Sequence, residues 1–273
     1  MFCLMRFFSI LFVIFFYSSS IAGDKLPEPV TWNTELKELV FDEDEKFFDG
    51  KGVLELETPY RALDAAMVPI NVKFLNNQSK DNYVKSLTLI VDENPSPVVS
   101  RFDFSHKIGN ASLTTRIRVD KYTYVRAIAE MNDAKKYMVA NYVKAAGGCS
   151  APSLADMDAV MARMGKMKMK FIETGSEGSL NKAELLISHP NYSGLQFNQL
   201  TRAEIPAHFV NHIKVEQDGE MILEAHPDIS LSEDPSIRFH YLDSGGPLEI
   251  TVEDSEGQKF ASEYSSSQMI TSK

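Results

Sequence analysis

Cys149 is the residue of this chain best suited to covalent chemistry. Gly147 and Gly148 precede it, and the small residues 150–152 follow it. Glycine gives the backbone wide conformational freedom, so we expect a mobile loop that presents the thiol to solvent. A thiolate that attacks a sulfur centre forms a covalent sulfur–sulfur adduct. The residues therefore favour a reactive thiol at Cys149 that could carry a thiol-linked group.

The charge around Cys149 differs from that of the whole chain. Residues 135–170 include seven basic and two acidic residues, a net charge of +5, whereas the whole chain carries −10. Because positive neighbours favour the thiolate, we expect an accessible and partly ionised thiol. The alternative is an inert cysteine buried in a turn.

The histidines of the chain do not form a recognisable catalytic or metal-binding signature. A cysteine–histidine nucleophile needs a base within reach, and no catalytic motif surrounds any histidine. His208 and His212 are four residues apart in a segment that favours a strand, where they would share a face, but the glutamate of the zinc-binding His-Glu-x-x-His pattern is missing. The chain also has no phosphate-binding glycine loop and no haem-attachment motif. We therefore expect no metal site.

The first 23 residues have the pattern of a secretory signal peptide. Arg6 is followed by an apolar run over 7–17 and then by small residues, which predicts cleavage near Ala22 or Gly23. The apolar run is shorter than the roughly 20 residues that span a bilayer, so we expect no membrane insertion after signal removal. We expect the mature protein in the bacterial periplasm. Cys3 leaves with the signal peptide, which makes Cys149 a lone thiol in an oxidising compartment.

The composition argues against a nucleic-acid partner. Without residues 1–23 the chain keeps 27 basic and 38 acidic residues, a net charge of −11. Proteins that bind nucleic acids need a basic face to neutralise phosphates, and this chain is acidic. A basic protein partner would instead be attracted over a long range.

Short runs rich in β-branched and aromatic residues, separated by turn residues, predict an all-β protein made of β-sandwiches. Gln217-Asp218-Gly219 has the pattern of a hairpin turn. A helical pattern over 150–165, with Met157, Val160, Met161 and Met164 on one packing face, separates the two halves. We therefore expect two sandwich domains in tandem, at 24–149 and 166–273, joined by a short linker helix.

Two series of motifs resemble the SoxY and SoxZ subunits of the bacterial thiosulfate-oxidising (Sox) system. The first half is similar to SoxY and the second half to SoxZ. The SoxY-like stretches are Thr58–Ile70, Asn94–Pro97, Thr115–Arg118 and Gly147–Cys149. The SoxZ-like stretches are Ile187–Pro190, Ile205–Phe209 and Asp234–Pro235. The order of these motifs resembles a fused SoxYZ-like protein of the type associated with quinoprotein alcohol dehydrogenases.

The resemblance implies two immunoglobulin-like sandwiches and no bound cofactor. It implies that Cys149 is the attachment point for a small sulfur-containing group, with Gly147 and Gly148 as a flexible arm. Cys149 would hold sulfur intermediates as a conjugate while separate periplasmic oxidoreductases process them, so that the chain itself is not an enzyme. The partners would be Sox-type enzymes, or a quinoprotein dehydrogenase with its c-type cytochrome. In SoxY two further glycines follow the cysteine near a free terminus, whereas here 150–152 are Ser-Ala-Pro and the chain continues.

Two other functions remain open at this point. The acidic composition fits a non-covalent accessory or docking module for a quinoprotein dehydrogenase and its basic cytochrome. A thiol enzyme is the least favoured of these functions, because no sequence motif for a catalytic base accompanies Cys149.

Overall fold

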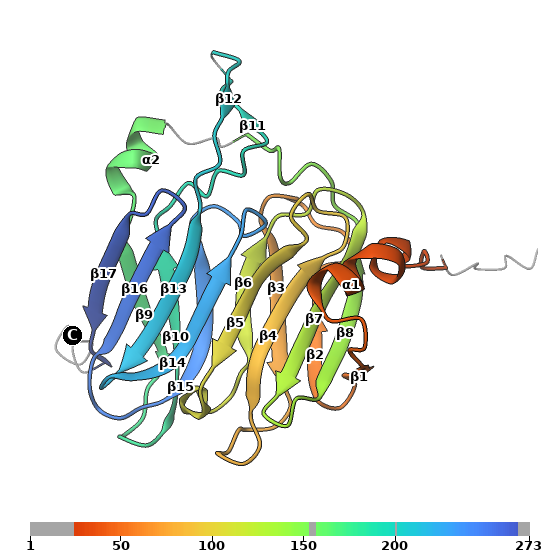
Figure 1. Ribbon diagram of the computed structural model, residues 1–273. Coiled ribbons are helices and arrows are strands. Elements are labelled where there is room, and N and C mark those ends of the chain that lie inside the picture. The colour runs from red at the N-terminus through yellow and green to blue at the C-terminus, as the bar shows by residue number, and fades with distance from the viewer. Residues whose placement is uncertain (1–24, 153–156, 200, 267–273) are drawn as a thin grey trace, which may run out of the picture.

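The computed structural model describes residues 25–152, 157–199 and 201–266. Two β-sheets pack face to face, and the two halves of the chain lie side by side within them (Figure 1). The predicted signal peptide and its cleavage position lie outside the described residues. Among the described residues, no helix is long and apolar enough to cross a membrane.

The described residues form short helical segments and many short strands. The helical segments are η1 (Trp32–Leu36), α1 (Lys37–Val40), η2 (His106–Ile108) and α2 (Met157–Arg163). The strands of the first half are β1 (Phe47–Asp49), β2 (Leu54–Glu57), β3 (Val68–Phe74), β4 (Val84–Val91), β5 (Val98–Phe104), β6 (Leu113–Ile117), β7 (Thr123–Met131) and β8 (Lys136–Val143). The strands of the second half are β9 (Met167–Glu173), β10 (Leu180–Ile187), β11 (Gln196–Phe197), β12 (Glu204–Ile205), β13 (Val210–Gln217), β14 (Glu220–Pro227), β15 (Ser236–Leu242), β16 (Leu248–Asp254) and β17 (Lys259–Tyr264).

Both sheets run without a break from one half of the chain into the other. The larger sheet has the order β1-β8-β7-β4-β5-β14-β13-β16-β17, and the smaller has β2-β3-β6-β15-β10-β9. The halves join where β5 pairs antiparallel with β14 and where Thr114 of β6 pairs with Arg238 of β15. An open sheet edge leaves backbone N–H and C=O groups unpaired, and this pairing satisfies them.

The predicted fold class, an all-β chain of two immunoglobulin-like sandwiches with a short helix between them, is confirmed. Alternation explains it, because β10 buries every second residue and such strands hide one face from water. The hairpin at Asp218-Gly219 is also confirmed, with both residues at positive φ (52° and 74°) between β13 and β14, as a two-residue turn of this type requires. The sequence did not predict the joined sheets.

The linker helix is shorter than predicted. It covers Met157–Arg163 rather than 150–165, while residues 153–156 lie outside the described part of the chain. Val160 is buried, but Met161 is exposed, so the predicted packing face is wrong at that position. Arg163 ties the helix to the second half through an ion pair of 2.5 Å with Asp234.

The shared core predicts that the two halves unfold together. Leu223 of β14 is fully buried and pairs with Phe104 of the other half. We expect a single transition in urea, and we expect Leu223→Ala to lower the free energy of unfolding by about 2–5 kcal/mol, as buried leucine truncations do. The exposed Leu63 supplies the control, since Leu63→Ala leaves the midpoint nearly unchanged. Two separate transitions would contradict a common core.

Candidate functional site

The thiol of Cys149 is buried. It lies in the segment that follows β8 and crosses one end of the sandwich toward α2 (Figure 1), and its side chain has no exposed surface. The expectation of an exposed thiol on a mobile loop is therefore wrong for this structure. The physical reason is that both halves of the chain contribute contacts to this loop.

Gly147 and Gly148 hold the loop against the first half instead of forming an arm that projects into solvent. The N–H of Gly147 donates to the carbonyl of Asp120 at 2.8 Å, and the N–H of Gly148 donates to that of Val119 at 2.9 Å. A Cβ on Gly148 would lie 2.1 Å from the carbonyl oxygen of Ala65. Gly148 is thus required by close backbone packing, which the sequence pattern alone could not distinguish from flexibility.

The second half of the chain covers the loop from the other side. The hydroxyl of Ser193 donates to the carbonyl of Cys149, and the side-chain amide of Gln196 donates to that of Ala151 at 2.7 Å. Both donors follow β10, more than forty residues along the chain from the loop, and both are buried. No sequence signal marked them, because their role depends on how the two halves join.

Arg118 connects the two halves directly beneath the loop. Its guanidinium is 1% exposed, and it donates to the carbonyl of Gly148 at 3.2 Å and to that of Asn191 at 3.1 Å. Within the described part of the chain its Nε has no hydrogen-bond partner, and burial lowers the pKa of the group. Arg118 lies in one of the SoxY-like stretches, which is the one signal that could have pointed to it.

The electrostatic surroundings keep the thiol protonated. Burial and, to a smaller extent, the charge of Asp120 raise the pKa of Cys149 to about 12, against the opposing charge of Arg118. The prediction of a partly ionised thiol is therefore wrong for this conformation. The basic residues of 135–170 do not form the site: Lys136, for example, pairs with Glu45 at 2.7 Å and Arg163 with Asp234.

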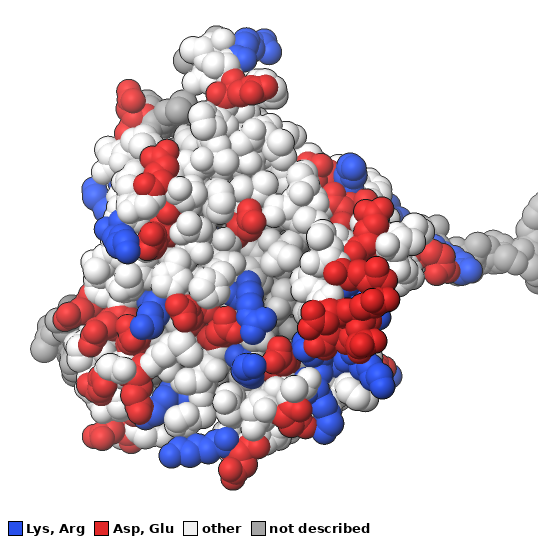
Figure 2. Space-filling model, viewed as in Figure 1, with Lys and Arg blue, Asp and Glu red and all other residues white. Residues whose placement is uncertain are grey.

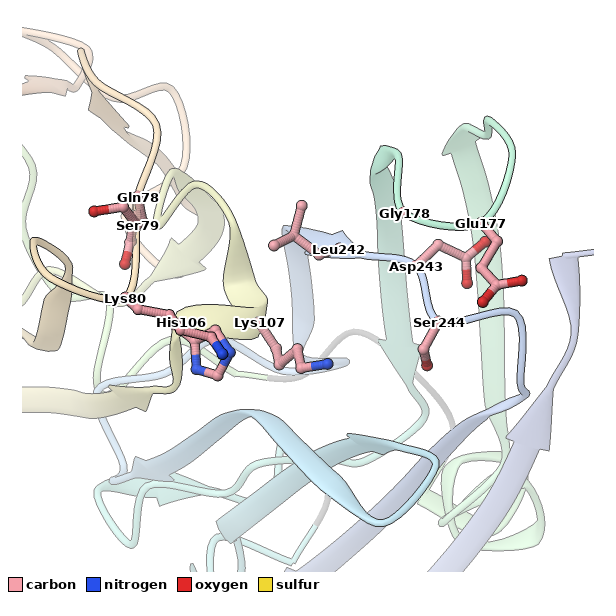
Figure 3. A pocket seen from close by; sticks show the side chains of 10 residues that line it. All are labelled: Gln78, Ser79, Lys80, His106, Lys107, Glu177, Gly178, Leu242, Asp243 and Ser244. Atoms are coloured by element: carbon pink, nitrogen blue, oxygen red, sulfur yellow. The ribbon is translucent and has the colours of Figure 1, made fainter.

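A pocket of about 640 Å³ lies away from Cys149. Lys80, His106 and Lys107 line one side, and Glu177 and Asp243 line the other (Figure 3). His106 and Lys107 lie in η2, which precedes β6, whereas the Cys149 loop packs on the residues that follow β6. The pocket and the thiol are therefore at opposite ends of that strand.

His208 and His212 do not share a face, so that expectation is wrong. A bulge between Val210 and His212 changes the alternation of side chains. His212 is half-buried and bonds to Glu224 at 2.6 Å, while its ring stacks on His226. His208 is buried and faces His189 and Asp254.

Two family models match the chain in tandem and cover most of it. The model of sulfur oxidation protein SoxY matches residues 37–149, and that of sulphur oxidation protein SoxZ matches residues 169–265. The chain therefore belongs to the SoxY and SoxZ families, as a fused SoxYZ-like protein. The SoxY match ends at Cys149 itself. No curated protein matches the sequence.

Solved structures resemble parts of the chain only distantly. The sulfur carrier protein SoxY from Chlorobium limicola f thiosulfatophilum is 21% identical, with a TM-score of 0.27, over 34% of this chain and 75% of that one. The superoxide reductase (neelaredoxin) from Ignicoccus hospitalis is 14% identical, with a TM-score of 0.31, over 34% of this chain and 79% of that one. At these scores the likenesses support no functional argument.

The buried thiol predicts a specific dependence of stability on pH. A pKa near 12 in the folded protein, against 9.0 ordinarily, means that folding retains a proton that the unfolded chain releases above about pH 9. This contribution to stability is complete below pH 9 and declines as the pH rises toward 12, by at most about 1.4 kcal/mol per pH unit. We expect the wild type to lose stability relative to Cys149→Ala over this range in urea titrations with reductant. Parallel curves from pH 7 to 11 would contradict the raised pKa.

Proposed function

We propose that this protein is a covalent sulfur carrier and that Cys149 holds the cargo. The single observation that carries the proposal is that the SoxY family match ends at Cys149, the one free cysteine among the described residues. SoxY from Chlorobium limicola f thiosulfatophilum is described as a sulfur carrier protein. The carrier bears its substrate for separate enzymes and needs no cofactor of its own.

Loading requires the loop to open. In the closed conformation the thiol is buried and protonated, and a protonated thiol is a poor nucleophile. The contacts that close the loop include the bonds from Ser193, Gln196 and Arg118 to the carbonyls of Cys149, Ala151 and Gly148. When these bonds break, water reaches the sulfur and its pKa returns toward the ordinary value. A docked partner enzyme supplies the contacts that replace them.

The chemistry of loading defines the class of partner. If the Cys149 thiol joins an anion such as thiosulfate, one sulfur–sulfur bond forms, one proton leaves and two electrons must be accepted. The partner is therefore an oxidoreductase with an electron acceptor, as a Sox-type enzyme or a quinoprotein dehydrogenase with its c-type cytochrome would be. If the cargo arrives as a disulfide, thiolate attack releases a thiol and needs no oxidant.

A docking module without covalent chemistry is the second candidate. The buried thiol favours it, and so does an acidic surface near the amino-terminal helix. Figure 2 shows acidic side chains gathered over α1 and the segment after it. The exposed acidic residues of this region are Glu35, Glu38, Asp42, Glu43 and Asp44. A surface of this kind attracts a basic partner such as a cytochrome.

The carrier proposal predicts an adduct on Cys149. Protein isolated from its native cells without reductant should show a mass increase that dithiothreitol removes, and peptide mapping should place it on Cys149. Cys149→Ser should abolish the adduct and keep the fold. Ser193→Ala, which removes one loop contact, should react faster with a thiol reagent, because the loop opens more often. An unmodified thiol in native protein, with a wild-type phenotype for Cys149→Ser, would favour the docking module.

The proposal also includes export to the periplasm. The amino-terminal pattern predicts that mature protein begins near Gly23 or Asp24, and Edman sequencing of the periplasmic fraction checks this. Recovery of the intact amino terminus from the cytoplasm would remove the argument from an oxidising compartment, although Cys149 would remain the sole thiol of the described residues.

A further inference from the structure

Three buried side chains converge beside the Cys149 loop. His189 follows β10, His208 precedes β13, and Asp254 ends β16. Nε2 of His208 lies 2.9 Å from Oδ2 of Asp254, and Nε2 of His189 lies 3.5 Å from the same oxygen. One ligand atom from each residue lies within 4.8 Å of the others.

His189 shows that this cluster is incomplete. Its side chain has no exposed surface, yet its Nε2 makes no well-formed hydrogen bond among the described residues. Buried polar atoms are rarely left unpaired in native proteins. The contact of this nitrogen is Oδ2 of Asp254 at 3.5 Å, beyond the length of an ordinary N–H···O bond, and His208 faces the same oxygen.

The surrounding hydrogen bonds orient the three side chains toward a common point. Nδ1 of His189 lies 3.0 Å from Oδ1 of Asn191 and accepts from the backbone N–H of Asn191 at 3.1 Å. The same Oδ1 accepts from the N–H of Val210 at 3.0 Å. The other carboxylate oxygen of Asp254 accepts from the N–H groups of Glu256 and Gln258, both at 2.9 Å. These bonds leave Nε2 of His189 and Oδ2 of Asp254 facing inward. Partners of this kind typically support metal ligands.

We propose that His189, His208 and Asp254 bind one divalent transition-metal cation of the zinc class. Zinc accepts imidazole nitrogen and carboxylate oxygen at about 2.0–2.2 Å in a tetrahedral arrangement. Ligand atoms of such a site lie about 3.3 Å apart, close to the 2.9 and 3.5 Å measured here. Three protein ligands leave a fourth position for water or another small ligand. This site is independent of the carrier function of Cys149 and goes beyond it.

His208 is the least buried of the three side chains, with 7% of its surface exposed, and its Nδ1 lies 3.7 Å from the half-exposed carboxylate of Glu256. We therefore expect a cation to enter from the side of His208. The site also adjoins the thiol loop, because the carbonyl of Asn191 accepts from Arg118, which in turn donates to the carbonyl of Gly148. We therefore expect metal binding to stabilise the segment after β10, which covers Cys149.

Titration of the chelator-treated protein with Zn²⁺ and with Co²⁺ tests the proposal. Titration calorimetry should give one tight site per chain, and metal binding should raise the melting temperature. Bound Co²⁺ should show the intense visible absorption that is typical of a four-coordinate site. His189→Ala and Asp254→Asn should weaken binding by at least about 100-fold. The control is His212→Ala/His226→Ala, which removes the other paired histidines and should bind as the wild type does.

Histidine ring ¹⁵N spectra of the wild-type protein keep the test decisive even where a buried variant fails to fold. Addition of Zn²⁺ should shift Nε2 of His189 and His208 and leave His212 unchanged. Absence of tight binding to the wild type would overturn the proposal and leave a hydrogen-bonded pair of His208 and Asp254. Binding that disappears in the His212/His226 control but persists in His189→Ala would also overturn it.

Discussion

The buried guanidinium of Arg118 is the interaction on which the site depends. It belongs to the first half of the chain, and it bonds to a carbonyl of the cysteine loop and to a carbonyl of the second half. A buried charge is costly unless its hydrogen bonds are satisfied, so the two carbonyls must stay where they are. Arg118 thereby fixes the loop against both halves. Its positive charge also opposes the effect of burial and of Asp120 on the pKa of the Cys149 thiol.

The joined sheets make this arrangement possible. Because β5 pairs with β14 and β6 with β15, the segment after β10 is held over the end of the first half, where it reaches the cysteine. The bonds from Ser193 and Gln196 join residues that are close in space but more than forty residues apart in the chain. The same rigid pairing orients His189 and Asn191, so the thiol loop and the histidine cluster share one supporting segment.

The sequence predicted what depends on local patterns and missed what depends on the joining of the halves. The β-rich architecture, the hairpin at Asp218-Gly219 and the importance of Cys149 followed from alternation, turn chemistry and cysteine count. The exposure of the thiol did not, because Gly147 and Gly148 allow either a mobile arm or close packing, and contacts from Ser193 decided between them. The pairing of His208 with His189 rather than with His212 arose from a bulge, which no spacing rule reveals.

A sulfur carrier must protect the sulfur atom that bears its cargo and must also expose that atom to a partner. In this structure different features meet the two requirements. Protection comes from burial, which keeps the thiol protonated and so limits unwanted disulfides. Release depends on a few side-chain bonds to backbone carbonyls of the loop and on the backbone bonds from Gly147 and Gly148. Each is worth about 0.5–1.5 kcal/mol, or up to about 3 kcal/mol for the charged donor. Their sum is within the free energy that a protein–protein interface of ordinary size can supply. Opening by a docked partner is therefore energetically feasible without unfolding either sandwich. Because two of these donors belong to the SoxZ-like half, that half acts as the cover of the thiol as well as a structural neighbour.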